Sequence, residues 1–556
     1  MKGSSLLRSG VPLYLALGLL WSCSSSSGKK VVPIDQGAAG EAGAAGDSSS
    51  SGGAGNSGGG GSGGVEELGG APAEGGSGGE PGEGGAGGAA PAFHGLYLGV
   101  DGLDTNDGSH DAPFLTLAHA VSVALPGDTI VYLDGTFAPS PVATIPDGVD
   151  VMAEHAGAAK LKCSFANLFT FAGTSRVEGL EFDACAQPIV AVTAGKLTMV
   201  DLYIVSGGTE TGAVHIGGKV SATLTGSAGH VYSLAGANLF YISDTASLSV
   251  TGGTFQNVAT GSFTGNGLFR TADAAKLSLK DLIVVNTLQA TVSAGGTSVV
   301  TVDHCTMDLL AQTLVLLRNQ STFISKNGTR LALKPAAASR YECIRSELNG
   351  GSISIDDTEI TGCSNGINGA LPPTMTISNS NIHHNDGTGL ELSGNGTFAN
   401  LSISNTELSD VGTLNTQIHA AIRFNTGSIL TMKLRGVTIK TIGAAFTDAS
   451  GIFVQSAPAG CSFDFGTLAD PGLNTFQTNG LGVGLRMAAS NQDATVISAV
   501  GNTWTPNVQN ADAQGKYSVP AGGPKVLDVV GPTNNVTGAA NYSLSLPTTL
   551  RLAQIP

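Results

Sequence analysis

The chain has 556 residues, a formal net charge of −16, 12% charged and 5% aromatic residues, and 81 glycines. Low charge at ordinary hydrophobicity argues against a wholly disordered chain and for a β-rich, turn-rich body with enough apolar side chains for a core. The negative charge repels phosphate backbones, so nucleic acid is excluded as an expected partner.

The first 22 residues are expected to be a secretory signal. Lys2 and Arg8 precede an apolar run, residues 11–20, which is too short to span a bilayer permanently. The stretch "LWSC" ends at Cys23 and resembles the lipobox of bacterial lipoproteins, in which this cysteine is lipidated. Because Ser24 and not Asp follows, the resemblance implies sorting to the outer membrane or cell surface. The alternative is an ordinary signal peptide with an incidental cysteine.

Residues 23–91 are predicted to be a disordered tether. They consist of Gly, Ser and Ala with scattered Glu and almost no large apolar residue. Such a segment cannot bury enough apolar surface to offset the entropy lost on ordering, so no binding role is expected for it.

Residues 92–140 are predicted to form an N-terminal cap and the first strand. A short amphipathic helix over residues 115–125 places Leu117, Val121 and Leu125 on one side, and a turn and a strand follow. The acidic stretch "DGLDTNDGSHD" just before it makes Asp101, Asp104 and Asp107 candidate ligands for Ca²⁺. The spacing of these residues does not match the EF-hand pattern. The alternative is that the aspartates are present because they form Asx turns.

Residues 141–545 are predicted to be a parallel β-helix, and residues 546–556 a C-terminal tail. Eight rows share one pattern: "LTMVDLYI" (197–204), "LSVTGGTF" (248–255), "LSLKDLIV" (277–284), "VTVDHCTM" (300–307), "ISIDDTEI" (353–360), "MTISNSNI" (375–382), "LSISNTEL" (401–408) and "MKLRGVTI" (432–439). Positions one, three and eight are always apolar, and positions two and four are mostly polar, which is strand alternation.

The fifth position of each row predicts a sharp bend after each strand. It holds Asp201, Gly252, Asp281, His304, Asp357, Asn379, Asn405 and Gly436. Gly, Asn, Asp and His are the residues that best tolerate a left-handed backbone. Successive rows start 22 to 31 residues apart, or about twice that where a degenerate row lies between them. One strand and one bend per coil of this length indicate an all-β, parallel β-helix, whose open end the predicted helix would cover.

Both ends of this region resemble one bacterial family. The stretch "DGLDTNDGSHDAPFLTLAHAVSVALPGDTIVYLDGTF" (101–137) is similar to the start, and "GNTWTPNVQNADAQGKY" (501–517) to the C-terminal end, of a family of uncharacterised proteins. These proteins have an N-terminal cap domain that opens a right-handed parallel β-helix of the pectate-lyase-like superfamily. The resemblance implies the right-handed fold and implies no activity.

Six cysteines follow Cys23. The pairs Cys163–Cys185 and Cys343–Cys363 are each separated by about one coil, and export permits disulfides, so we expect these two links. Cys305 and Cys461 are too far apart along the coils to pair and are expected to be free thiols. No C-x-x-C motif is present, which weakens thiol-redox and zinc interpretations.

The rows also bring ionisable residues together. Stacking places Glu359 and Glu407 at the same position two coils apart, roughly 10 Å, with His384 and Asp410 nearby and Arg435 in the next row. They are the candidate catalytic residues, and the alternative is a solvated face whose charges keep the protein soluble.

The sequence therefore favours a lipid-anchored cell-surface scaffold or a module that binds glycans or matrix. The superfamily resemblance implies the alternative, a polysaccharide lyase that uses Ca²⁺ or a glycoside hydrolase that uses paired carboxylates. Trp504 is the only tryptophan after the signal, which leaves few aromatic rings for sugar subsites. Neither the ligand nor the oligomeric state can be inferred.

Overall fold

The computed structural model describes the folded body of the chain and not its first 93 residues. Described are residues 94–477, with gaps at 139–140, 164–166, 184, 186, 208–211, 227–230, 235–237, 261–266, 286–289, 310–312, 334–340, 395–397, 413–418, 427–428, 443–449, 457–460 and 468, and then residues 483–487, 496–498, 502–505, 516–517 and 529–530. The predicted signal, Cys23, the tether and the tail 546–556 lie outside the described residues.

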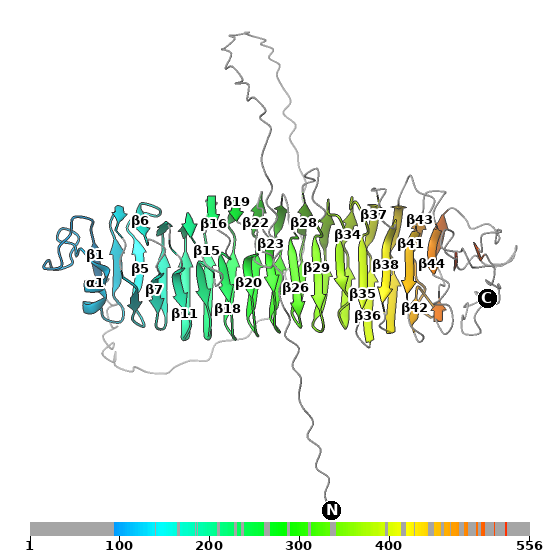
Figure 1. Ribbon diagram of the computed structural model, residues 1–556, viewed down its shortest axis with the longest axis horizontal. Helices are drawn as coiled ribbons and strands as arrows, with labels where there is room; N and C mark the ends of the chain where they lie inside the picture. Colours follow the sequence, from blue (N-terminus) through cyan, green and yellow to red (C-terminus); the bar gives the residue numbers. More distant parts are fainter. Residues whose placement is uncertain are drawn as a thin grey trace, which may run out of the picture. The chain divides into compact units, whose positions relative to one another are not determined.

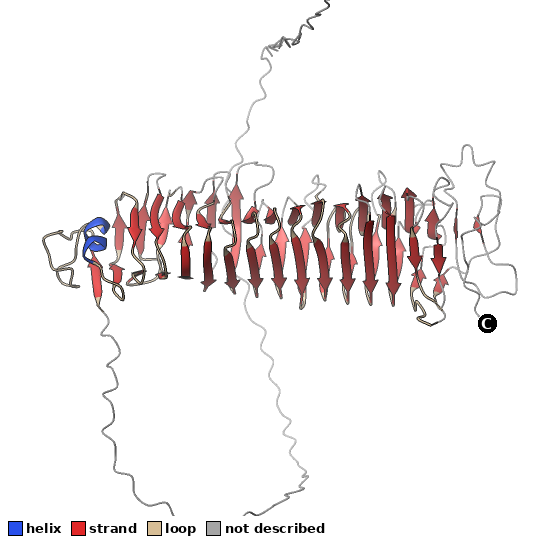
Figure 2. Cartoon of the chain, turned by 90° about the horizontal axis from the view of Figure 1, so that it is seen from below, coloured by secondary structure: helices blue, strands red, loops and turns tan. Residues whose placement is uncertain are grey.

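The body is a parallel β-helix in which each full coil contributes one strand to each of three faces (Figures 1 and 2). The first face contains β1 (Gly95–Leu98), β2 (Thr129–Tyr132), β5 (Asp150–Ala153), β8 (Ser175–Glu178), β11 (Ala194–Val200), β15 (Lys219–Thr225), β18 (Ser247–Thr251), β21 (Lys276–Lys280), β24 (Val299–Asp303), β27 (Thr322–Lys326), β30 (Ser352–Asp356), β33 (Thr374–Ser378), β36 (Phe398–Ser404), β39 (Ile429–Arg435), β42 (Ser462–Asp464) and β45 (Val496–Ser498).

The second face consists of two sheets. They contain β3 (Gly135–Phe137), β6 (Ala159–Lys162), β9 (Glu181–Asp183) and β12 (Tyr203–Ile204), and then β13 (Ser206–Gly207), β16 (Val231–Leu234), β19 (Thr254–Thr260), β22 (Ile283–Val285), β25 (Thr306–Leu309), β28 (Thr329–Leu333), β31 (Thr358–Thr361), β34 (Asn381–His383), β37 (Glu407–Val411), β40 (Thr438–Ile442), β43 (Thr475–Gln477) and β46 (Thr503–Thr505).

The third face closes each coil. It contains β4 (Ala143–Ile145), β7 (Asn167–Phe171), β10 (Gln187–Ala191), β14 (Val214–Ile216), β17 (Phe240–Ile242), β20 (Gly267–Thr271), β23 (Ala290–Ala294), β26 (Val315–Asn319), β29 (Ile344–Leu348), β32 (Ile367–Ala370), β35 (Leu390–Gly394), β38 (Ala420–Thr426), β41 (Ser450–Ser456), β44 (Val483–Met487), β48 (Val529–Val530) and β47 (Lys516–Tyr517). Only β47 and β48 pair antiparallel among the described strands. The predicted fold class, a nearly all-β parallel β-helix, is confirmed.

The core consists of inward side chains stacked coil upon coil. Along the first face, Leu248, Leu277, Val300, Phe323 and Ile353 are register partners on consecutive strands, and all five are buried. Each fully buried side chain of this size contributes about 1.5–3 kcal/mol relative to an exposed one. The alternation read from the rows is therefore the alternation between the core and the surface of the first face.

Each predicted bend residue lies at the corner between the first and second faces with a left-handed backbone. The φ angles of the eight run from 43° at Asp357 to 67° at Gly252. Gly226, with a φ of 73°, and Asn327, with a φ of 57°, hold the same corner in the coils between rows. These are the degenerate rows that the doubled spacing predicted.

The helix covers the N-terminal end of the stack (Figure 2). It is α1 (Leu117–Val123), shorter than the predicted 115–125, with Leu117 and Ala120 buried and Val121 packed against the core. Leu125 lies beyond its end and is 67% exposed. Since β1 and β2 already belong to the first face, the coils begin before residue 141. No helix in the described residues is both long and apolar enough to cross a membrane.

Candidate functional site

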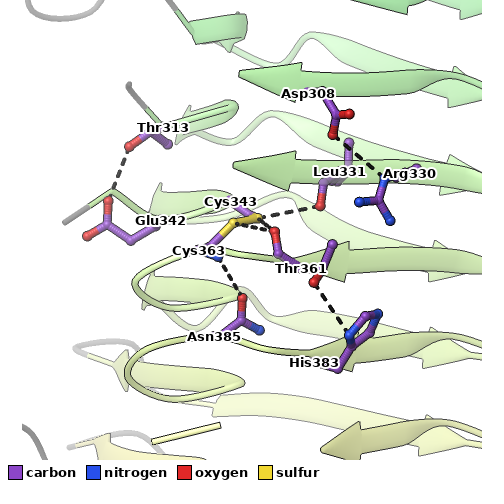
Figure 3. Close-up of a disulfide and its surroundings, with 10 residues drawn as sticks. All are labelled: Asp308, Thr313, Arg330, Leu331, Glu342, Cys343, Thr361, Cys363, His383 and Asn385. Carbon is purple, nitrogen blue, oxygen red and sulfur yellow. Dashed lines mark hydrogen bonds and ion pairs between the residues drawn. A yellow bond between two sulfur atoms is a disulfide. The ribbon is translucent and has the colours of Figure 1, made fainter. Parts of the chain in front are cut away.

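A row of ionisable side chains, acidic and basic in turn, runs along the outside of the second face. It is formed by Asp308, Arg330, Glu359, His383, Glu407 and Lys440, one from each of six consecutive strands from β25 to β40; we call it the ion row. Arg330 Nη1 pairs with Glu359 Oε2, and its Nε lies 3.6 Å from Asp308 Oδ1 (the latter pair is drawn in Figure 3). His383 Nε2 donates to Glu359 Oε1 at 2.9 Å.

The second half of the ion row is arranged in the same way. Glu407 Oε1 lies 2.9 Å from Lys440 Nζ and accepts a hydrogen bond of 2.9 Å from the Ser409 hydroxyl. Asn381 separates the two glutamates in register, so Glu359 and Glu407 lie two coils apart, as the stacking predicted.

Both carboxylates are held as anions. Partial burial raises the pKa of Glu359, but the hydrogen bonds from Arg330 and His383 outweigh it, and the pKa lies below its usual range. Partial burial likewise opposes the shift at Glu407, whose pKa is lowered by Lys440 and Ser409. Neither side chain is prepared to donate a proton near neutral pH.

His384 directly follows β34, and Asp410 lies in β37 one residue before its end, and both have a left-handed backbone. Their φ angles are 51° and 50°, and Gly362 holds the same place one coil earlier with a φ of 72°. His384 Nε2 lies 3.9 Å from Asp410 Oδ2. His383, which sequence reasoning missed, is the histidine that contacts Glu359.

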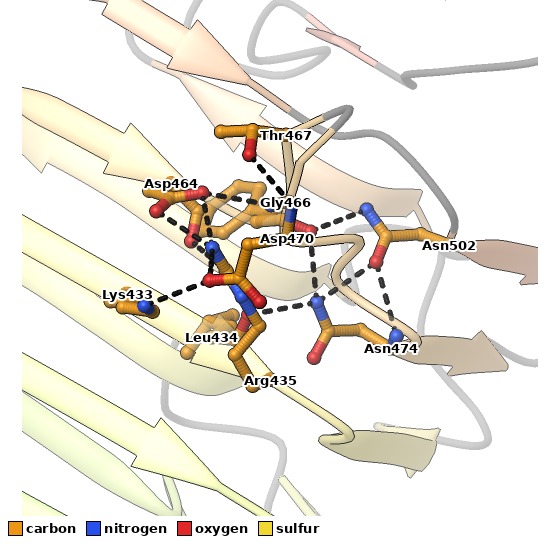
Figure 4. A network of polar contacts seen from close by, with 10 residues as sticks. Lys433, Leu434, Arg435, Asp464, Gly466, Thr467, Asp470, Asn474 and Asn502 are labelled. Carbon is orange, nitrogen blue, oxygen red and sulfur yellow. Dashed lines mark hydrogen bonds and ion pairs between the residues drawn. The ribbon is translucent and has the colours of Figure 1, made fainter. Parts of the chain in front are cut away.

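Arg435 does not join this group, so the predicted constellation is wrong in this member. The fourth position of a row precedes the bend and lies on the first face, whereas the seventh position follows it and lies on the second. Arg435 Nη2 instead contacts Asp464 and Asp470, each at 2.8 Å (Figure 4). The pKa of Asp470 falls to about 2 because Arg435 and Lys433 hydrogen-bond to it.

A second set of polar residues lies on the third face, and the rows gave no sign of it. Arg423 Nη1 pairs with Glu391, and Arg423 Nη2 donates to Gln455 Oε1 at 2.6 Å. Further along the same face the Arg270 guanidinium lies 5.3 Å from the centre of the Tyr241 ring. The sequence signal for this set was an aromatic residue, Tyr241, followed by a charged one, Arg270, at the same position of successive strands of the third face.

The outer side of the first face is lined by hydroxyls. Register partners on nine consecutive strands, β11 to β36, line this side. Eight of them carry a hydroxyl and the sixth is Ile324; the eight, in order, are Thr198, Thr223, Ser249, Ser278, Thr301, Ser354, Thr376 and Ser402. All of these hydroxyl-bearing residues are partly exposed. Neighbouring hydroxyls bond to one another, as Thr376 Oγ1 does to Ser354 Oγ at 3.2 Å. We call this set the hydroxyl face.

The cap aspartates serve the local backbone. Asp104 accepts hydrogen bonds from the Leu115 and Thr116 amides at 3.1 and 2.8 Å and from the Thr116 hydroxyl at 2.7 Å. Asp107 accepts from the Ser109 amide at 2.9 Å, which is an Asx turn. With Asp101 they form no group of three side-chain ligands among the described residues.

The structure contains the disulfides Cys163–Cys185 and Cys343–Cys363 (the latter in Figure 3) and buried free thiols at Cys305 and Cys461. Burial raises the pKa of the Cys305 thiol to about 11 and also raises that of Cys461. A buried thiol that stays protonated is a poor nucleophile, so neither is a catalytic candidate.

A cavity of about 430 Å³ lies between α1 and the first coils, away from the ion row. Its walls are mostly apolar and include Leu115, Tyr132, Phe137 and Leu161. None of the five predicted catalytic residues lines this cavity.

Comparison with solved structures returns polysaccharide lyases. A rhamnogalacturonan lyase matches with 12% identity and a TM-score of 0.26 over 66% of this chain and 83% of its own. The pectate lyase Pel9A matches with 14% and 0.23 over 62% and 79%, and the alginate lyase AlyF-OU02 with 12% and 0.24 over 78% and 89%. No protein family and no curated protein matches the sequence. At these identities and scores, no chemistry is carried over to this chain.

Proposed function

We propose that this protein is exported, anchored to the cell surface through Cys23, and binds extended glycans or other matrix polymers along its β-helix without cleaving them. The signal-like first 22 residues and the lipobox-like "LWSC" support the anchor. The body supports the binding role, because the hydroxyl face presents a hydroxyl in eight of nine consecutive coils, interrupted at Ile324, at a spacing of about 4.8 Å per coil.

The observation that carries the proposal is that each candidate catalytic side chain already forms an ion pair with another residue of the β-helix. A glycoside hydrolase needs one carboxyl held protonated, yet Glu359 and Glu407 both have lowered pKa values. They also lie two coils apart, about 10 Å, which is too far for a retaining mechanism at about 5 Å and at the upper limit of the roughly 6.5–9.5 Å of inverting enzymes. Arg435, the arginine among the candidates, is bonded to two aspartates.

The charge of the chain indicates which polymers to expect. With a net charge of −16, the protein repels uronate polymers at long range. Neutral polysaccharides suffer no such repulsion, and their hydroxyls match the donors and acceptors of the hydroxyl face. We therefore expect neutral glycans to bind more tightly than polyuronates.

The proposal is tested with the Cys23→Ser chain, which keeps the whole sequence but loses the lipidated residue. Binding to neutral and uronate polysaccharides, with and without Ca²⁺, is measured together with the release of reducing ends and unsaturated products. The double variant Ser278→Glu, Thr376→Glu perturbs the hydroxyl face, and Glu359→Gln is the matched control on the second face.

We expect the protein to bind a neutral polysaccharide and to release no products from it. The hydroxyl-face variant should weaken this binding at least tenfold, and Glu359→Gln should leave it unchanged. Products that appear with wild type and vanish with Glu359→Gln would establish the enzymatic alternative. Binding that only Glu359→Gln abolishes would place the site on the second face.

A further inference from the structure

We infer that Asp134, Glu154 and His155 bind one divalent transition-metal ion of the Zn²⁺ type at the N-terminal end of the β-helix. One ligand atom from each of the three lies within 4.8 Å of the other two. His155 Nδ1 lies 3.0 Å from Asp134 Oδ1 and 3.9 Å from Glu154 Oε2. Ligands about 2.0–2.1 Å from a tetrahedral Zn²⁺ are about 3.3 Å apart, so these separations need only small adjustments.

The fold brings the three residues together at equivalent corners of adjacent coils. Asp134 follows β2, and Glu154 and His155 follow β5, in each case where the chain turns from the first face to the second. The corners are stacked, because the Glu154 amide donates to Tyr132 O and the Gly135 amide to Ala158 O, at 2.8 and 3.1 Å. The next coils turn at a single left-handed residue, whereas this corner spans several residues whose side chains are exposed.

A second histidine orients the central carboxylate. His110 lies in the loop between β1 and α1, and its Nε2 donates to Glu154 Oε1 at 3.0 Å, leaving Oε2 toward His155. The His110 ring is itself held edge-on against Tyr97, with ring centres 5.2 Å apart. Hydrogen bonds of this kind fix the direction of metal-binding carboxylates. His110 is therefore a positioning residue for the site.

The charges at this corner favour a cation. Three carboxylates, those of Asp111, Asp134 and Glu154, gather around the two histidines, and within the described residues no Lys or Arg forms an ion pair with any of them. An imidazole ligand selects Zn²⁺ and similar ions over Ca²⁺ and Mg²⁺, which prefer all-oxygen sites. This site is separate from the predicted Ca²⁺ candidates Asp104 and Asp107, whose oxygens accept backbone hydrogen bonds.

The structural consequence would be a link between two coils, with the cap loop held to them through His110. A bound ion would join the corner after β2 to the corner after β5, where the second face begins with β3, a strand that pairs with β6 on one side only. Because the ion binds the folded state only, it would raise the midpoint of thermal unfolding in a concentration-dependent way.

The test is isothermal titration of the full Cys23→Ser chain, without a polyhistidine tag, with Zn²⁺, followed by competition with Ca²⁺ and Mg²⁺. The two free thiols are buried and do not compete. His155→Ala and Asp134→Asn remove ligands, and His110→Ala removes the positioning contact. His304→Ala is the matched control, since His304 also bonds to a carboxylate, that of Asp281 at 2.7 Å, but belongs to no three-residue ligand group.

We expect one Zn²⁺ per chain, at least tenfold weaker binding in His155→Ala and Asp134→Asn, and about tenfold weaker binding in His110→Ala. His304→Ala should bind like wild type, and millimolar Ca²⁺ should not compete. Three results would overturn the inference: no saturable binding at one equivalent, an equal loss in His304→Ala, or displacement of Zn²⁺ by Ca²⁺. Circular dichroism of each variant shows whether a loss reflects unfolding instead.

Discussion

Glu359 is a candidate catalytic residue whose carboxylate the fold holds between two donors. It lies between Arg330 and His383, which come from the coils on either side, and both contact its carboxylate. A carboxylate between two donors is stabilised as an anion, and this is the state that the lowered pKa reflects.

A Glu359→Gln variant should therefore be less stable at neutral pH by about 0.2–1 kcal/mol, the usual range for partly exposed ion pairs. The folded pKa lies below the ordinary value of 4.5, so the contribution is complete above that value and is lost as the pH falls through the folded pKa. Urea unfolding at pH 7 and pH 3 measures the difference, which should shrink in acid. A difference in unfolding free energy between the two proteins that is larger at pH 3 than at pH 7 would contradict the ion pairing of Glu359.

The bend residues allow a sharper prediction at the same scale. Asn405 has a φ of 46°, which a β-branched residue resists and glycine accepts. Asn405→Val should cost about 1–2 kcal/mol of unfolding free energy. Asn405→Gly should cost much less, although it loses the hydrogen bond of 3.3 Å to Asn379. Equal losses in urea titrations of the two variants would show that the backbone conformation is not what the position requires.

At the scale of elements, α1 depends on its N-terminal cap. The Thr116 hydroxyl accepts from the His119 amide at 3.2 Å and donates to Asp104 Oδ2 at 2.7 Å. Thr116→Val removes both bonds at nearly constant volume and should destabilise the fold by about 1–2 kcal/mol. Thr116→Ser keeps the hydroxyl and should retain most of the stability. If calorimetry finds the two variants alike, the cap does not hold the helix.

Two of the three faces could be predicted from the sequence, and the third could not. Each row contains a strand of the first face, the bend, and the start of a strand of the second face, at fixed spacing. The third strand begins after a variable number of residues: β29 starts at Ile344 after β28 ends at Leu333, whereas β35 starts at Leu390 after β34 ends at His383. Without fixed spacing the polar residues of the third face could not be aligned.

The bend also decides which candidate residues lie together. Glu359 and Glu407 share a position after the bend, so their stacking followed from the rows. Arg435 precedes the bend, and a row written as one line does not show that its fourth and seventh positions face different directions. His383 was missed because its neighbour His384 matched the alignment.

At the scale of the whole molecule, the proposal joins the β-helix to a lipid anchor. Replacing Cys23 with Ser should release the protein from membranes, because a single serine cannot accept the lipid that the lipobox-like sequence implies. Fractionation of cells and detergent partitioning measure this. Unchanged partitioning would mean that the signal is an ordinary one and that Cys23 is incidental.

The register of successive coils is the claim on which the ion row, the hydroxyl face and the metal site all depend. Cys163–Cys185 and Cys343–Cys363 each join adjacent coils, with Cα separations of 4.6 and 5.6 Å. Peptide mapping under non-reducing conditions should find these two links and free thiols at Cys305 and Cys461. A Cys163–Cys461 link would contradict the fold, since twelve coil spacings, about 58 Å, separate those residues along the stack.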